Sequence, residues 1–292
     1  MSTRRQLEVT HSARGSPHAG DNTPMKLSRA LPVTALRDYV RGFEQREADI
    51  ESSVVFPIAA RPYQFLEFYL QGKYLVESCD SRIRDVVPQA VVVGPSTYRS
   101  VDLVLHGHLA VFTIQFQPSG FHRLFGVPMP ELTDRALEAR SVLGPSFCEL
   151  ERRLADAPSF NERVQLAANF LLDQGVGRCK PDIVARLAND VLESWGALPL
   201  REAVERSGLS LRQLERRFRE TVGIAPRRYA RIVRFHAASE AKARLNERAW
   251  TDIAHDLGYY DQMHMVHDFR IFAGESPTGW NKRLAAIRQS WL

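Results

Sequence analysis

The last third of the chain carries one pattern twice. The segment Phe-Arg-x-x-x-Gly-x-x-Pro at residues 218–226 recurs at residues 269–277, which is an offset of 51 positions. At the same offset Ser210 corresponds to Asp261. A match at one fixed offset indicates two copies of one supersecondary unit. The chain must therefore fold so that two similar units follow each other.

The first copy has the sequence of a capped helix. Ser210 is a good N-cap, because its hydroxyl can accept a hydrogen bond from a backbone N–H of the first turn. Residues at helical spacing predict one apolar stripe; they are Leu211, Leu214, Phe218 and Val222. Gly223 ends the helix, since glycine adopts the left-handed conformation readily. A shorter helix before it ends at Ser207-Gly208, so residues 198–223 are typical of a helix-turn-helix unit.

The second copy repeats this plan over residues 250–274. Gly258 makes the turn, Asp261 is the N-cap, and Gly274 ends the second helix. Its predicted inward residues are Ile253, Ala254, Leu257, Met265, Phe269 and Phe272. The sequence therefore predicts two helix-turn-helix units in an all-α domain.

A long helix is predicted between the two units, over Pro226–Leu245. Proline is well placed at the first helical position, and no Gly or Pro interrupts the rest. Twenty helical residues span about 30 Å, and one turn of B-DNA is about 34 Å. Such a rod can hold two recognition helices in successive major grooves of one duplex.

The excess positive charge lies in the same region. Residues 180–292 contain 19 Lys and Arg against 14 Asp and Glu, whereas residues 1–179 contain 20 of each kind. A basic module attached to a neutral domain is the distribution expected of a protein that binds double-stranded DNA.

The residues of both units resemble AraC/XylS-type transcription regulators. In the first unit the similarity lies in Ser-Gly-Leu-Ser at 207–210, the helix 212–218, Gly223 and Pro226. In the second it lies in Ile253-Ala254, Leu257–Gln262, Phe269-Arg270, Gly274 and Ser276-Pro277. The resemblance covers about residues 185–285 and none of the first 175. It implies a variable sensing or dimerising N-terminal domain, and activation of transcription through contact with RNA polymerase.

The first recognition helix carries a row of arginines opposite its apolar stripe, because Arg212, Arg216 and Arg219 follow at i, i+4 and i+7. Arginine can bind guanine, glutamine adenine, and glutamate can accept from cytosine. The residues expected at the DNA are Ser210, Arg212, Gln213, Glu215, Arg216 and Arg219. The resemblance places Arg212, Glu215 and Arg216 at base-reading positions. Candidates for phosphate contacts are Arg217, Arg227, Arg228, Arg231 and Arg234.

The second recognition helix has a different chemistry. The residues expected to face the groove are Gln262, Met263, His264, Val266 and His267. Between Asp252 and Glu275 one basic residue, Arg270, stands against five acidic ones. We therefore expect unequal units, in which the first supplies most of the affinity and of its salt dependence. The second is expected to add modest sequence preference or to serve partly as structure.

The preceding region predicts an α+β domain. Short runs rich in Val, Ile, Phe and Tyr predict strands; they are Ser53–Ile58, Gln64–Leu70, Lys73–Glu77, Ala90–Gly94, Val101–His106 and Leu109–Gln117. They favour an antiparallel sandwich or small barrel. A helix is expected around Pro32–Arg46, and trailing helices after Pro118 are either a dimer seam or core cover. We expect a flexible tail at 1–24, this sensing or dimerisation domain at 25–178, and the DNA-binding domain at 179–292.

A small-molecule effector is expected in the N-terminal domain from its architecture, and no residue names it. Aromatic residues alternating along the strands are candidates for a pocket lining, although plain core is the simpler interpretation; they are Phe65, Phe68, Tyr69, Tyr98, Phe112 and Phe116. His106-Gly107-His108 is a metal-ligand pattern without an evident third ligand, and its glycine favours a solvated hairpin tip. No metal or cofactor is predicted.

Other functions are less consistent with the sequence. It has no nucleophile elbow, P-loop, HExxH or dinucleotide-binding motif, so no enzyme is predicted. A β-barrel metal-dependent enzyme fused to a DNA-binding module is the alternative, and an architectural DNA binder would need a larger positive excess. Three scattered cysteines favour buried thiols over disulfides or zinc. No apolar run or signal peptide is evident, so we expect a cytoplasmic protein without a membrane span; the sequence leaves dimerisation open.

Overall fold

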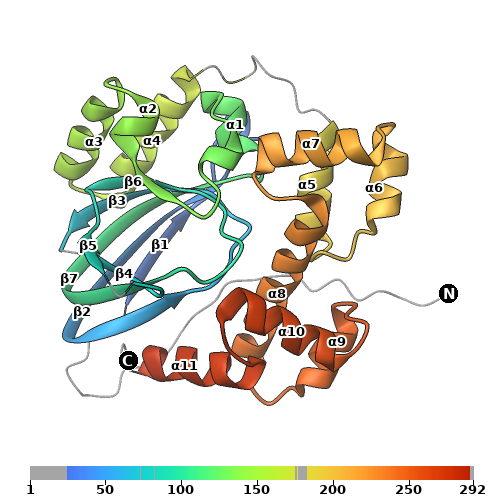
Figure 1. The fold of residues 1–292 in the computed structure, drawn as a ribbon. Helices are drawn as coiled ribbons and strands as arrows, with labels where there is room; N and C mark the ends of the chain where they lie inside the picture. The colour runs from blue at the N-terminus through green and yellow to red at the C-terminus, as the bar shows by residue number, and fades with distance from the viewer. Residues whose placement is uncertain (1–24, 73, 82, 175, 177–182, 290–292) are drawn as a thin grey trace.

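The fold is described from a computed structural model that covers residues 25–289, apart from 73, 82, 175 and 177–182. A curved β-sheet with helices on one face is followed by a helical domain (Figure 1). This is the predicted combination of an α+β domain and an all-α domain. The predicted tail at 1–24 and the predicted boundary at 178–179 lie outside the described residues.

The sheet has eight strands, and every pairing is antiparallel. The strands are β1 (Lys26–Ala30), β2 (Val40–Ile58), β3 (Phe65–Gln71), β4 (Leu75–Ser78), β5 (Arg84–Val86), β6 (Ala90–Val93), β7 (Val101–Phe116) and β8 (Ala136–Glu138). The main order is β1-β2-β7-β3-β6-β8, and β4 and β5 extend the sheet from the first half of β7. The long strands β2 and β7 pair along their whole lengths, with an irregularity between Ile50 and Val54. Each of these two strands therefore contributes to both halves of the sheet. The sheet is curved, and its concave side encloses an interior space.

The helix expected at Pro32–Arg46 is wrong. Only a 3-10 turn forms there, at Thr34–Leu36, and β2 begins at Val40. Phe43 and Gln45 are buried at the two-residue spacing of a strand, and the segment pairs with both β1 and β7. Pairing on both edges thus decides for a strand, as tertiary context often does.

The hairpin tip expected at His106-Gly107-His108 is also wrong. The two strands predicted on either side are one strand, β7, and Gly107 lies opposite Ile50 of β2. Both histidines are exposed, and His108 Nδ1 lies 2.6 Å from Asp49 Oδ1 on the neighbouring strand.

Helices cover one face of the sheet (Figure 1). They are α1 (Gly120–Phe125), α2 (Ala139–Leu143), α3 (Phe147–Asp156) and α4 (Phe160–Asp173), with a 3-10 helix η2 at Met129–Glu131. Phe147 of α3 stacks on Phe68 of β3 with ring centres 5.5 Å apart, and Ala167 and Leu171 of α4 are fully buried in the same core. The trailing helices therefore cover the core, as one of the two interpretations expected.

The helical domain packs two helix pairs around one long helix. Its elements are α5 (Ile183–Glu193), α6 (Leu200–Ser207), α7 (Leu211–Val222), α8 (Pro226–Arg244), α9 (Trp250–Asp256), α10 (Gln262–Ala273) and α11 (Pro277–Gln289). Helices α6 and α7 form the first helix-turn-helix unit, α9 and α10 the second, and α8 runs between them (Figure 1). One core joins all of them, with Phe235 of α8 against Phe269 of α10 at 4.7 Å between ring centres.

Candidate nucleic-acid interface and ligand cavity

The first recognition helix, α7, begins with a capping box. The Ser210 hydroxyl accepts from the Gln213 backbone N–H at 3.3 Å, and Gln213 Oε1 accepts from the Ser210 backbone N–H at 3.0 Å. The predicted N-cap is therefore confirmed, and the reciprocal bond fixes where α7 starts. Because Gln213 uses its amide oxygen in the cap, its amide N–H groups are the part left to meet DNA.

The opposite face of α7 is exposed and basic. Arg212, Arg216 and Arg219 are exposed and Glu215 is half-buried. On the inner face Leu214, Phe218 and Val222 are buried, whereas Leu211 is 42% exposed and does not belong to the predicted stripe. The first residue of α7 therefore lies outside the core.

The second recognition helix, α10, begins at the predicted cap. Asp261 Oδ1 accepts from the His264 backbone N–H at 2.7 Å. The exposed residues of this helix include Gln262, Met263, His264 and His267. Tyr260, just before the cap, is 91% exposed and was not among the predicted contact residues. Its exposure was not expected, because a tyrosine beside a turn is usually interpreted as a core residue.

The long helix α8 spans about 28 Å at 1.5 Å per residue over its 19 residues. Two of its arginines have partners on other elements of the helical domain. Arg231 donates to the buried carboxylate of Asp268 in α10 at 2.6 Å, and Arg234 donates to the Gly196 carbonyl at 2.7 Å. These two side chains hold the domain together, so Arg227, which is exposed, is a better candidate for a phosphate contact.

The first unit rests on the N-terminal domain at the end of α7. The Thr133 hydroxyl donates to the Gly223 carbonyl at 2.9 Å, and Arg228 donates to the Thr97 carbonyl at 3.0 Å. The Thr97 hydroxyl donates in turn to the Asp134 carboxylate at 2.9 Å. The loop after η2 therefore positions the C-terminal end of the first recognition helix.

The second unit meets the N-terminal domain at the loop after β2. The Ala60 backbone N–H donates to the carbonyl of Phe272, near the end of α10, at 2.8 Å. The Ala60 carbonyl faces His236 Nε2 of α8 at 2.6 Å. Burial lowers the pKa of His236, against the opposing influence of the Ala60 carbonyl and of Glu240. A neutral His236 can donate its Nε2 proton to Ala60.

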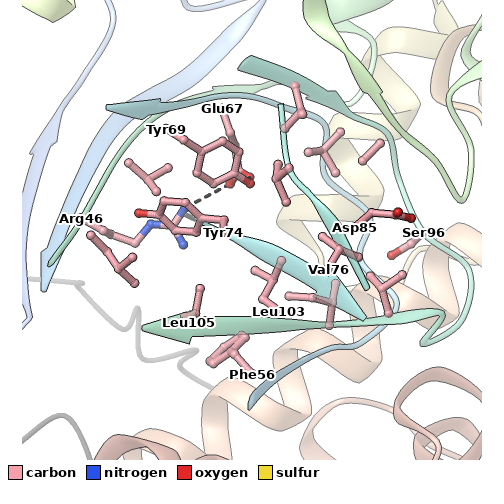
Figure 2. Close-up of a pocket in the computed structure, with 18 of the residues that line it drawn as sticks. Arg46, Phe56, Glu67, Tyr69, Tyr74, Val76, Asp85, Ser96, Leu103 and Leu105 are labelled. Carbon is pink, nitrogen blue, oxygen red and sulfur yellow. Dashed lines mark hydrogen bonds and ion pairs between the residues drawn. The ribbon is translucent and has the colours of Figure 1, made fainter. Parts of the chain in front are cut away.

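The curved sheet encloses a cavity of about 680 Å³. Apolar side chains of β2, β4 and β7 form much of the wall, among them Phe56, Val76 and Leu105 (Figure 2). Two further lining residues, Leu284 and Ile287, come from α11 of the helical domain. The volume lies within the range of about 300–1,000 Å³ found for small-molecule sites.

A polar cluster occupies one end of this cavity, where Arg46, Glu67, Tyr69 and Tyr74 lie together (Figure 2). Arg46 donates to Glu67 at 3.1 Å, and the Tyr69 hydroxyl donates to the same carboxylate at 3.0 Å. Burial, reinforced by the Glu67 carboxylate, raises the pKa of Tyr69. Burial lowers the pKa of a further lining residue, Arg61.

The candidate lining residues from the sequence are mostly core. Of the six aromatic residues, Tyr69 lines the cavity, whereas Phe68, Phe112 and Phe116 are buried in the other core, beneath α3 and α4. Tyr98 is 43% exposed. The charged lining residues Arg46, Arg61 and Glu67 were not among the predicted ones. A charged residue at an alternating position inside a strand is itself an indication of a polar site.

Within the described part of the chain, no group of three or more His, Cys, Asp or Glu side chains is arranged to hold a metal ion. No helix among the described residues has the length and apolar character needed to cross a membrane.

Comparison with known families identifies the helical domain. Residues 203–283 match the family model described as "Helix-turn-helix domain", and residues 28–138 match "Domain of unknown function (DUF6597)". No curated protein matches the sequence. The expected resemblance to AraC-type regulators is confirmed for the C-terminal domain, which has the helix-turn-helix units of a DNA-binding transcription regulator.

Solved structures that resemble the chain are remote in sequence. A singly substituted apo form of ToxT from Vibrio cholerae strain SCE256 is 10% identical with a TM-score of 0.47, over 87% of this chain and 100% of that one. ToxT from Vibrio cholerae O395 bound to (E)-4-(8-methylnaphthalen-1-yl)but-3-enoic acid is 8% identical with a TM-score of 0.45, over 90% and 100%. A cupin superfamily protein from Desulfitobacterium hafniense DCB-2 is 15% identical with a TM-score of 0.23, over 34% and 83%.

Proposed function

We propose that this regulator reads its operator with α7 and α10 in successive major grooves, and that a small molecule in the N-terminal cavity modulates it. The observation that carries the first part is the pair of capped helices, Ser210–Val222 and Asp261–Ala273, with polar faces free of the core. Helix α8 separates them by about the length of one DNA turn.

The two helices contribute differently to recognition in this proposal. Arg212, Glu215 and Arg216 read base edges and Arg219 supports them, since arginine and glutamate have distinct partners in the major groove. On α10, Gln262 can read adenine, and Met263 can contact a thymine methyl group. The predicted contact surface also includes Ser210, Gln213, His264 and His267.

Selection of binding sites from random DNA by the full-length protein tests this proposal. We expect a motif of two elements spaced by one helical turn, with the stronger preference in the element read by α7. The Arg216→Ala variant should lose the stronger element, while Arg29→Ala, on the distant strand β1, should select the same motif as the wild type. Enrichment without any motif, at every salt concentration, would contradict the proposal.

The cavity carries the second part of the proposal. An apolar site of this size with a small polar cluster is the usual form of a ligand pocket. We propose no catalysis there. The alternative, a metal-dependent enzyme, has His106, His108 and Asp49 as its nearest candidates, and zinc analysis of the purified protein discriminates between the two.

Three further features of the proposal follow from the resemblance to AraC-type regulators. We propose that the protein activates transcription by contacting RNA polymerase, that it acts in the cytoplasm, and that it can pair with a second copy through the N-terminal domain. Transcription from the selected operator in vitro tests the first, and sedimentation of the full-length protein tests the third. Repression in place of activation would overturn the first of these.

A further inference from the structure

Two arginines in the middle of α8 contact both helix-turn-helix units. Arg231 donates to Asp268 Oδ1 of α10 through Nε at 3.0 Å and through Nη2 at 2.6 Å. Arg234, three residues later and so on the same face of α8, donates to the Gly196 carbonyl at 2.7 Å. Its guanidinium also lies 5.3 Å from the centre of the Tyr259 ring, in the turn between α9 and α10. Because Gly196 lies in the turn before α6, one turn of α8 joins the first unit to the second.

The contact of α8 with the first unit is close. Gly196 has a φ of 77°, and a Cβ atom there would lie 2.2 Å from the Ala230 carbonyl oxygen of α8. The backbone N–H of Gly196 donates to the Val191 carbonyl of α5 at 2.8 Å. Both polar groups of this glycine are therefore bonded, the N–H to α5 and the carbonyl to Arg234. The turn before α6 cannot slide along α8 without breaking one of these contacts.

The contact of α8 with the second unit is buried and charged. Asp268 is 1% exposed and Tyr259 is 7% exposed. Burial, reinforced by the Asp268 carboxylate, raises the pKa of Tyr259, which therefore stays neutral. A buried ion pair adds little stability over an apolar pair of equal volume, yet it can specify one arrangement of the elements that it joins. The pair of Arg231 and Asp268 is thus suited to fix the position of α10 on α8.

Of the two recognition helices, only α10 has an acidic residue at this position. At the offset of 51 residues, Asp268 corresponds to Arg217 in α7. Helix α7 exposes three arginines that attract DNA phosphates, whereas α10 exposes one, Arg270. A helix that is drawn weakly to DNA benefits most from being held in its binding orientation beforehand, because preorganisation lowers the cost of association. The buried contacts of α10 with α8 supply this preorganisation.

We propose that Arg231 and Arg234 are positioning residues, which fix the orientation of α10 relative to α7 and thereby the one spacing of operator elements that the protein accepts. Asp268 and Tyr259 are their partners in the second unit, and Gly196 is the partner beside the first. Neither arginine needs to touch DNA for this role. The inference rests on the proposed function, because it concerns the distance between the two elements that α7 and α10 read.

Operators in which one base pair is inserted or removed between the two elements test this proposal with the full-length protein. Each change turns the second element by about 35° and shifts it by about 3.4 Å. Fluorescence anisotropy should show that the wild type binds the selected spacing about tenfold more tightly than either altered one, because a displaced second unit loses base and phosphate contacts together. A wild type that binds all three spacings equally would overturn the proposal and leave the reading of two elements intact.

Substitutions in α8 should relax this preference. Arg234→Met should reduce it to less than about threefold, because the second unit is no longer preorganised. Arg234→Lys should restore part of it, since lysine can still donate to the carbonyl and keep its charge near the ring. Arg231→Met combined with Asp268→Leu removes the ion pair without leaving a buried charge unpaired, and should relax the preference to a similar extent. Arg244→Met, at an exposed position near the end of the same helix, is the matched control and should keep the wild-type preference.

A further operator, with the α10 element scrambled at the selected spacing, separates a positioning role from loss of the second unit. The wild type and Arg234→Met should both bind it about twofold or more weakly than the intact operator. Insensitivity of Arg234→Met to scrambling would mean that its second unit no longer binds DNA, and would overturn the positioning role. An unchanged spacing preference in Arg234→Met or in the double variant would overturn the role of the arginine concerned. Selection that yields no motif with the wild type would instead contradict the proposed function.

Discussion

The two recognition helices begin and end in the same way and expose different chemistry. Both have a side-chain cap at the N-terminus and a left-handed glycine after the C-terminus, at Gly223 and Gly274. Helix α7 exposes three arginines, whereas α10 exposes one, Arg270, beside Gln262, Met263 and two histidines. The shared positions fix the helix-turn-helix geometry, and the exposed positions are free to set the affinity of each unit for DNA.

The units also differ in how they are attached to the rest of the protein. At Gly223 an added Cβ atom would lie 2.5 Å from Thr133 Oγ1, whereas at Gly274 the nearest atom, Arg99 Nη1, would be 3.9 Å away. The second unit instead meets the N-terminal domain through Ala60 and α11. The first unit is thus closely seated beside η2, and the second adjoins the cavity.

The largest expected effect concerns the second unit. Arg231→Met would leave the carboxylate of Asp268, which is 1% exposed, buried without its partner. We expect a loss of about 3–5 kcal/mol in the free energy of unfolding, measured in urea. Arg227→Met, at an exposed position in the first turn of α8, should change it by less than about 0.5 kcal/mol. A loss below about 1 kcal/mol for Arg231→Met would show that Asp268 finds another partner.

Substitution of the two equivalent glycines tests whether the N-terminal domain holds the first unit more closely than the second. Both have positive φ, 89° at Gly223 and 75° at Gly274, so alanine is strained at either position. We expect about 1 kcal/mol of destabilisation for Gly274→Ala and about 2–3 kcal/mol for Gly223→Ala, because the latter also displaces Thr133. The same urea experiment measures both. Equal values would mean that the first unit is not held more closely than the second.

The inequality in DNA binding is tested by one substitution in each helix. Arg216→Ala should weaken operator binding about tenfold to a hundredfold, since a bidentate contact to a base is worth about 1–3 kcal/mol. His267→Ala should weaken it less than about threefold. Fluorescence anisotropy at several salt concentrations should also show a smaller salt slope for Arg216→Ala alone. Equal losses from both variants would contradict the proposal of unequal units.

The smallest expected effect comes from exchanging the two caps. Asp261→Ser keeps a capping oxygen and removes a negative charge that faces DNA, so affinity should rise about twofold at low salt. Ser210→Asp should lower it by a similar factor, and neither should change the unfolding free energy by more than about 0.5 kcal/mol. A rise that persists at high salt would argue against an electrostatic cause.

The sequence predicted the DNA-binding domain better than the N-terminal domain. Caps at Ser210 and Asp261, and glycines at the ends of α7 and α10, are local features, so each could be recognised from a few neighbouring residues. Leu211 was placed in the apolar stripe, although it lies on the first turn beyond the core. The contacts of Arg231 and Arg234 were missed, because their partners are far away in the chain.

The N-terminal domain depends on pairings between distant segments. Val40–Arg46 was expected to be part of a helix and is a strand, since β1 and β7 lie on its two sides. The glycine of His106-Gly107-His108 suggests a turn, yet the strand continues because β2 pairs with it on both sides of the bulge. Such pairings leave little local trace in the sequence.

The sequence by itself therefore determined the two helix-turn-helix units, their caps and the difference in charge between their exposed faces. These properties arise from hydrogen bonds and side-chain spacing within a dozen residues. Only the tertiary structure decided that β2 and β7 curve around a cavity, that Arg61 faces into it, and that α11 completes its wall. Those features join residues more than 200 positions apart, such as Ile50 and Ile287, and packing between distant segments becomes visible only when the chain is folded.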